Sequence, residues 1–147
     1  MKTIFDQNAI DELTARIAQI SPQSKAQWGK MDAFQMVKHC GMSEEIFQGK
    51  RNYKRLFAGR LFGKMALGSI LKNQGEMKRG LPTHPDLKIT GTGDIEAEKL
   101  KWIGLLKAYT GYSNNNFIHP FFGKMNGEQV GAFVYKHTDH HLKQFAV

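Results

Sequence analysis

The sequence lacks the features of several large classes of protein. It contains one cysteine, Cys40, so no disulfide can form within the chain. No segment approaches the roughly 18 consecutive apolar residues that a membrane-spanning helix needs. The first residues include a lysine but no continuous apolar stretch, so we expect no secretory signal. Together these absences predict a cytoplasmic protein without a membrane span.

The composition that remains is that of one ordinary globular domain. The chain has 147 residues, of which 41% are hydrophobic and 23% are charged. A chain of this length can bury a sizeable core without disulfides or other cross-links. We therefore expect residues 1–147 to form a single domain.

The positive charge of the chain is concentrated in one segment. The formal net charge is +8, and residues 50–80 carry all of it, with nine basic side chains against Glu76 alone. The rest of the chain holds twelve basic and twelve acidic side chains, which cancel. Such a local excess predicts one positive face that attracts an anion. The candidate anion-attracting residues are Lys54, Arg55 and Arg60.

Residues 53–72, within this segment, predict a helix of an unusual kind. Its apolar residues surround most of the circumference, and Gly59, Gly63 and Gly68 lower its helix propensity. Because the segment is not cleanly amphipathic, nucleic-acid or membrane-surface binding is the least favoured function for it. Its aromatic side chains can equally be core residues: Tyr53, Phe57 and Phe62.

Three other segments carry the sequence signature of a helix start. Each has an N-cap residue that follows one apolar residue and precedes another by four positions, and these caps are Asp6, Asp32 and Asn126. A fourth start is predicted at Asp94, because Glu96 follows it in the first helical turn. Four main helices with one long central connection predict an all-α fold, a four-helix bundle. The predicted helices cover about 7–20, 32–48, 94–109 and 126 to near the C-terminus.

The last of these helices places two histidines on its apolar face. At about 100° per residue, His137 and His141 lie at the centre of the apolar arc. Asp139 lies on the opposite face, and His140 lies at the edge of the arc. Residues four apart project side by side, so both imidazoles can reach one ion. One histidine on an apolar stripe is more often an ordinary core residue. When two neighbouring histidines are buried, however, the ring nitrogens of both need polar partners, and these are hard to provide without an ion or water.

A third histidine, His39, lies on the inner side of the second predicted helix. Three neutral imidazoles supply three nitrogen ligands and leave a coordination position open, as in catalytic rather than structural sites. The donor set suits Zn(II) or Ni(II), with Fe(II), Mn(II) and Cu(II) as alternatives. His140 and His119 are candidates to support the ligands or to relay a proton. Cys40 points about 100° away from His39, so we interpret it as a small core residue.

These residues together resemble the DinB/YfiT-like metalloenzyme superfamily over nearly the whole chain. The matching motifs are Trp28-Gly-Lys-Met-Asp before the helix of His39, then His119-Pro-Phe-Phe-Gly, and finally Lys136-His-Thr-Asp-His-His141. The pattern from Tyr135 to Phe145 is similar to a subfamily of unknown function. The resemblance implies a bundle, often dimeric, in which one histidine of the second helix and a His-x-x-x-His pair of the last helix hold a divalent metal. Those positions are His39, His137 and His141.

The resemblance also implies a range of functions, because some members of the superfamily are metal-dependent transferases or isomerases that use low-molecular-weight thiols. We expect a metal-dependent enzyme that activates a small, anionic thiol for S-transfer or a water molecule for hydrolysis. The alternative is a non-catalytic metal-binding or sensing module. We further expect a homodimer, because the resemblance favours one and residues 56–71 offer apolar surface that a lone bundle does not cover.

Overall fold

Five α-helices carry most of the structure, a computed structural model that describes residues 2–72, 75–114 and 117–147. The predicted all-α class is confirmed, although two short strands form a small hairpin at residues 118–124. None of the helices in the described residues is long and apolar enough to cross a membrane. The α-helices are α1 (Gln7–Ala18), α2 (Ala33–Phe47), α3 (Phe57–Lys72), α4 (Ile95–Lys107) and α5 (Gly127–Gln144). The remaining elements are the 3-10 helices η1 (Pro85–Leu87) and η2 (Ala108–Gly111) and the antiparallel strands β1 (Ile118–His119) and β2 (Gly123–Lys124).

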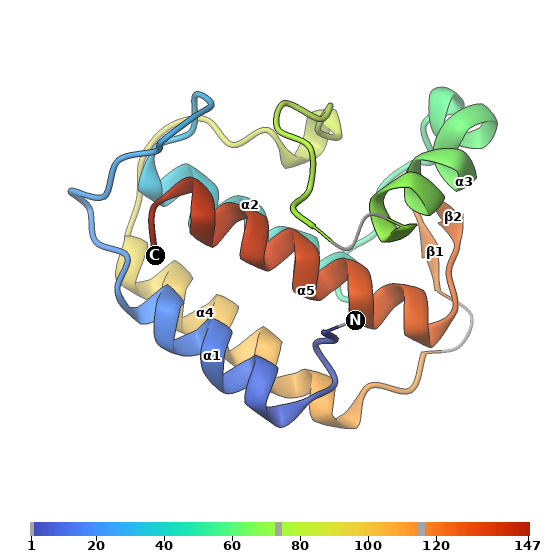
Figure 1. Cartoon of the computed structure of the whole chain (residues 1–147). Coiled ribbons are helices and arrows are strands. Elements are labelled where there is room, and N and C mark those ends of the chain that lie inside the picture. Colours follow the sequence, from blue (N-terminus) through green and yellow to red (C-terminus); the bar gives the residue numbers. More distant parts are fainter. Residues whose placement is uncertain (1, 73–74, 115–116) are drawn as a thin grey trace.

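Helices α1, α2, α4 and α5 surround the main apolar core. Both α1 and α2 pack against α4 and α5, whereas α3 lies to the side, against α5 and β2 (Figure 1). Burying one large apolar side chain contributes roughly 1.5–3 kcal/mol before entropy is considered, so these stripes dominate the stability of the fold. The fully buried residues of the four helices include Ile10, Leu13, Ile17, Met36, Phe47, Trp102, Leu106, Val130 and Val134.

The starts of α2 and α5 are fixed by reciprocal caps. The side chain of Asp32 accepts the backbone N–H of Gln35, and the Gln35 side chain accepts the N–H of Asp32. Asn126 and Gln129 form the same capping box. At Asp6 the predicted side-chain cap is missing, because the backbone carbonyl receives the first helical N–H groups instead. The two capping boxes fix the axial position of the helices that carry the predicted metal ligands.

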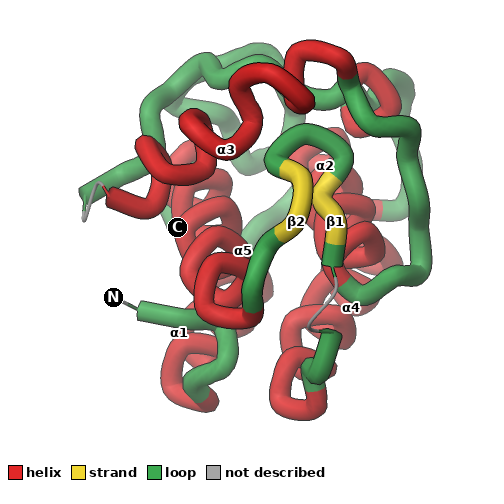
Figure 2. Tube along the Cα trace, turned by 90° about the vertical axis from the view of Figure 1, so that its right-hand side faces the viewer, coloured by secondary structure: helices red, strands yellow, loops and turns green. Residues whose placement is uncertain are grey.

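Helix α3 packs on the hairpin through its glycines (Figure 2). A methyl group at Gly59 or Gly63 would collide with the backbone of Phe121, so both positions require glycine. These residues lower the helix propensity of α3, as predicted, but they also let it approach the hairpin closely. Phe57 and Phe62 are 76% and 54% exposed, so their interpretation as core residues is wrong.

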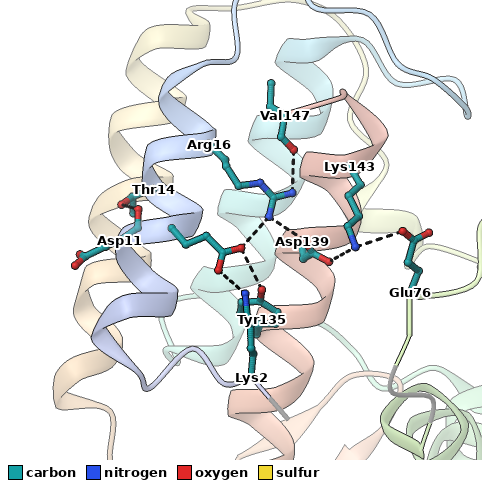
Figure 3. A network of polar contacts seen from close by, with 10 residues as sticks. Lys2, Asp11, Thr14, Arg16, Glu76, Tyr135, Asp139, Lys143 and Val147 are labelled. Atoms are coloured by element: carbon teal, nitrogen blue, oxygen red, sulfur yellow. Dashed lines mark hydrogen bonds and ion pairs between the residues drawn. The ribbon is translucent and has the colours of Figure 1, made fainter.

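A network of ion pairs holds α1 against the outer side of α5 (Figure 3). The guanidinium of Arg16 donates to Asp139 at 2.8 Å and to the carbonyl of Val147 at 2.9 Å. Lys143 forms ion pairs with both Asp139 and Glu76. The pair with Glu76 attaches the segment that follows α3 to α5. Asp139 therefore faces away from the apolar arc of α5, as its position on the helix predicted.

Candidate metal centre

The structure brings together the three histidines that the sequence predicts as ligands. His39 projects from α2, and His137 and His141 project from successive turns of α5. One ring nitrogen from each lies within 4.8 Å of the other two. The closest pair is formed by the Nε2 atoms of His39 and His137, which are 3.3 Å apart. Two helices from distant parts of the sequence, α2 and α5, therefore converge on one point.

Hydrogen bonding fixes the tautomer of His39. Its Nδ1 lies 2.9 Å from the backbone carbonyl of Leu87, at the end of η1. A carbonyl oxygen can only accept, so Nδ1 must carry the proton and donate it. The lone pair of the neutral ring is then on Nε2, which is the atom that faces His137.

A longer chain of hydrogen bonds fixes His141 in the same tautomer. Its Nδ1 lies 2.8 Å from Oε1 of Gln144, whose Nε2 donates to the backbone carbonyl of Trp28 at 2.7 Å. The backbone carbonyl of Gln144 also accepts the N–H of Gln27 at 2.7 Å. The orientation of the amide is thus set by the loop before α2, and the Nε2 lone pair of His141 is left free for an ion.

His137 differs from the other two because it is only half-buried. His39 and His141 are only 4% and 7% exposed, so His137 is the most exposed of the three rings. One face of the His137 ring stacks on Phe133, with centroids 5.7 Å apart and planes inclined by 12°. Its buried Nδ1 has no hydrogen-bond partner among the described residues. The ring is therefore positioned by packing rather than by a second hydrogen bond.

Burial lowers the pKa of all three imidazoles. Loss of hydration is the main cause for each, and the neighbouring rings add to it for His137 and His141. The pKa of His141 falls to about 3, and that of His137 falls well below its ordinary value. A lowered pKa keeps each ring neutral at pH 7, and the neutral form is the one that can bind a metal.

The donor set and its spacing fit a divalent ion. Two nitrogens that each lie about 2.0–2.1 Å from a tetrahedral zinc ion are separated by roughly 3.3–3.4 Å. The observed separation of the Nε2 atoms of His39 and His137 is 3.3 Å. The three histidines can therefore hold one divalent metal ion.

The two histidines predicted to support the ligands lie beside the cluster rather than in it. The ring of His140 is 5.2 Å from that of His141 and 5.7 Å from that of Trp28. Nδ1 of His119 accepts the backbone N–H groups of Phe121 and Phe122, so this ring is held in the hairpin turn. Burial lowers the pKa of His119 to about 3. Their roles in proton relay remain predictions.

The basic candidates belong to the segment around the start of α3 and not to the two helices of the cluster. Lys54, Arg55 and Arg60 are exposed at the N-terminal end of α3. Within the described part of the chain, none of these three side chains forms a hydrogen bond or an ion pair with His39, His137 or His141. Cys40 is fully buried beside Met36, as its interpretation as a core residue requires, and burial raises the pKa of its thiol.

A buried carboxyl group, Glu44, was missed from the sequence, where no carboxylate stood out on the inner helix faces. It is completely buried, and its Oε2 accepts the Tyr109 hydroxyl at 2.5 Å. Burial raises the pKa of Glu44 to about 8, so it is mostly protonated at pH 7. A signal was available, because Glu44 lies four residues after Cys40 and three before Phe47, on the same buried stripe.

Substitution of Gly29 should weaken metal binding without changing any ligand. Gly29 has φ +84°, and an added methyl group would lie 2.6 Å from Nε2 of Gln144. We expect Gly29→Ala to displace Gln144, release His141 and lower zinc affinity by about 10–100-fold, as the loss of a group that orients a ligand usually does. Competition with a chromophoric chelator would measure the change.

Gly49→Ala is the matched control for this substitution. Gly49 also has a positive φ, +70°, but an added methyl group would meet nothing within 4 Å. Both variants should lose about 1–2 kcal/mol of stability because alanine strains a left-handed backbone. Only Gly29→Ala should lose zinc affinity; equal affinities in the two variants would show that Gln144 does not position His141.

Comparison with known proteins gives one match. The family model described as "Protein of unknown function (DUF1569)" matches residues 2–147, which include both helices of the histidine cluster. No curated protein and no solved structure matches the chain. The function must therefore be argued from the site itself.

Proposed function

This chain belongs to the DUF1569 family, and from that premise we propose that it is a metal-dependent enzyme whose three histidines hold one divalent ion. Zn(II) or Ni(II) suits the donor set best, with Fe(II), Mn(II) and Cu(II) as alternatives. When bound, the ion would supply Lewis-acid chemistry, lowering the pKa of a small thiol or a water molecule so that it reacts at neutral pH.

The observation that carries this proposal is the pair of fixed tautomers. Leu87 and Gln144 each hold the Nδ1 proton of one histidine, so the Nε2 lone pairs of His39 and His141 are both directed into the cluster. Nε2 of His137 lies 3.3 Å from the first of them. A single cation can accept all three lone pairs, and each neutral ring keeps its full ligand strength.

The surrounding residues favour catalysis over a sealed structural site. Three protein ligands leave a position open for a small molecule. His137 is the most exposed of the three rings, so we place the open position on its side, whereas His39 and His141 lie deeper in the core. One face of the His137 ring stacks on Phe133. The chain thus positions the ligands and buries most of the site.

We also propose that the family is a branch of the DinB/YfiT-like superfamily. Four helices around one core, with α3 inserted in the long connection between α2 and α4, agree with the expected four-helix bundle. The ligands also agree, since one comes from the second helix and two, four residues apart, come from the last. The thiol chemistry of some superfamily members is therefore the first activity to test.

Cobalt substitution tests this proposal directly. With Co(II) in place of the native ion, a small thiol such as cysteine should enter the open position and produce a sulfur-to-metal charge-transfer band. The band should be absent in His39→Ala and retained in His140→Ala, because only the first substitution removes a ligand. Protein purified without chelator or nickel affinity should also contain about one divalent ion per chain.

Three outcomes would count against the proposal in different ways. A metal content below a tenth of an ion per chain, unchanged after incubation with Zn(II) and Ni(II), would show that the three histidines do not form a metal site. A cobalt spectrum that responds to small anions but to no thiol would favour metal-assisted hydrolysis over thiol transfer. A spectrum that responds to neither would favour a non-catalytic metal-binding or sensing module.

A further inference from the structure

The outer side of α3 exposes an apolar stripe that no other described element covers. Phe57, Leu61 and Met65, at intervals of four residues, are 76%, 63% and 70% exposed, and Phe62 beside them is 54% exposed. The opposite side of α3 is already occupied, because its buried residues pack towards the hairpin and α5. The residues buried on that side are Gly59, Gly63 and Leu67.

Basic side chains accompany this apolar stripe. Arg60 and Lys64 are exposed along the same helix, and Lys54 and Arg55 are exposed immediately before it. They belong to residues 50–80, whose net charge of +8 equals that of the whole chain. Large apolar groups and basic side chains are therefore exposed together on α3, whose backbone lies over the hairpin (Figure 2). The ammonium group of Lys64 also donates to the backbone carbonyl of Lys124.

The charge decides between the partners that could cover this surface. A second copy of the chain docked through α3 would place Arg60 and Lys64 of both copies in one interface, and like charges across an interface cost free energy. A nucleic acid would satisfy the charges but would leave Phe57, Leu61 and Met65 without an apolar environment. A bilayer with anionic headgroups satisfies both, because acyl chains accept the apolar side chains and the headgroups pair with lysine and arginine.

We infer that the outer face of α3 is a docking surface for an anionic lipid bilayer, on which the helix lies in the plane of the membrane. The sequence alone disfavoured this function because the segment is not cleanly amphipathic and because its aromatic residues could be core residues. The exposure of Phe57 and Phe62 removes the second objection, and the glycines buried on the opposite side give α3 one buried and one exposed face. The inference goes beyond the proposed enzyme function and does not depend on the metal centre.

A fluorophore at residue 65 tests the inference at the surface itself. Cys40 is buried, so Met65→Cys provides one accessible thiol for an environment-sensitive label. Leu100→Cys is the matched control, because Leu100 is equally exposed, at 71%, but lies on α4. Vesicles of phosphatidylcholine with phosphatidylserine should shift and enhance the emission at residue 65, and vesicles of phosphatidylcholine alone should not. The label at residue 100 should not respond to either.

Co-sedimentation with the same vesicles separates the apolar and electrostatic contributions. Phe57→Ser with Met65→Ser should lower the partition coefficient more than tenfold, since each buried methylene is worth about fourfold. Arg60→Glu with Lys64→Glu should lower the partition coefficient to a similar extent at low salt. Added salt should weaken the binding of the unmodified protein to the vesicles. All four side chains are exposed, but Lys64 also donates to the backbone carbonyl of Lys124, so circular dichroism must show that the fold of each variant is unchanged.

Other results would overturn the inference. Binding that survives the serine substitutions would be adsorption of a basic protein without insertion. A dimer in sedimentation that Leu61→Glu dissociates, without vesicle binding, would identify the face as a contact between copies of the chain. Binding to duplex DNA that depends on Arg60 and Lys64, again without vesicle binding, would assign the basic surface to nucleic acid.

Discussion

Replacing either His137 or His141 by alanine should abolish tight binding of a divalent ion, with a loss of affinity of more than about a hundredfold. Removing a group that merely orients a ligand typically costs 10–100-fold, and removing one of three ligands should cost more. His39→Ala should behave in the same way, because its Nε2 is the atom closest to His137, at 3.3 Å. Titration with zinc in competition with a chromophoric chelator would measure each affinity.

His140→Ala is the control for these substitutions. Its ring lies 5.2 Å from that of His141, on the same helix, but it is not one of the three rings whose nitrogens converge. We expect a change in zinc affinity of less than about threefold, within the range of weak electrostatic effects. Equal losses for residues 137, 140 and 141 would mean that the histidine-rich turn binds metal non-specifically and that the orientation of α5 is different.

The helices and the histidine cluster could be predicted because both depend on local sequence. Asp32 and Asn126 occur with a glutamine three residues later, and that pattern begins a helix whatever surrounds it. Once a helix begins at a known residue, its period of 3.6 residues places His137 and His141 on the face of Val130. The inward direction of all three ligands followed from these two facts.

The groups that orient the ligands could not be predicted, because they come from distant parts of the chain. Leu87 is 48 residues from His39, and it contributes a backbone carbonyl, which no side chain in the sequence reveals. Trp28 acts on Gln144 in the same way across 116 residues. A backbone carbonyl is present at every residue, so only the three-dimensional path of the loops decides which one is used.

Helix α3 shows a different limit of sequence interpretation. Its apolar residues surround the helix, and a pattern without a polar side does not say which face is buried. The decision depends on Gly59 and Gly63, which let that side approach the backbone of Phe121 and leave Phe57 outside. Glycine thus directed the packing here, although its propensity suggested only a weak helix.

Metal-free protein should become markedly less stable between pH 7 and pH 5. The folded-state pKa of His119 and of His141 is lowered from the ordinary 6.5 to about 3, and that of His137 is lowered well below 6.5. Below pH 6.5 the unfolded chain therefore takes up protons that the folded protein cannot accept. Stability contributed by these neutral rings is complete above pH 6.5 and is lost as the pH falls towards 3.

The expected loss is large, although Glu44 opposes it. His119 and His141 should each cost about 2 kcal/mol at pH 5, and the lowered pKa of His137 adds to this loss. The pKa of Glu44 is raised from 4.5 to about 8, so this group stabilises the folded protein more as the pH falls through the same range. Its gain of about 2–3 kcal/mol offsets part of the loss from the histidines, so we expect a net fall in stability and in the melting temperature between pH 7 and pH 5.

Two variants separate these opposing contributions. Glu44→Gln removes the group that gains protons on folding, so its melting temperature should fall more steeply between pH 7 and pH 5 than that of the unmodified protein. His141→Gln removes one neutral ring, so its melting temperature should fall less steeply. Calorimetry in the presence of a chelator would give the three slopes. Identical slopes would mean that the side chains of Glu44 and His141 are hydrated in the folded protein. A hydrated histidine cluster would not keep its rings neutral with their lone pairs directed at one point, and metal binding depends on both.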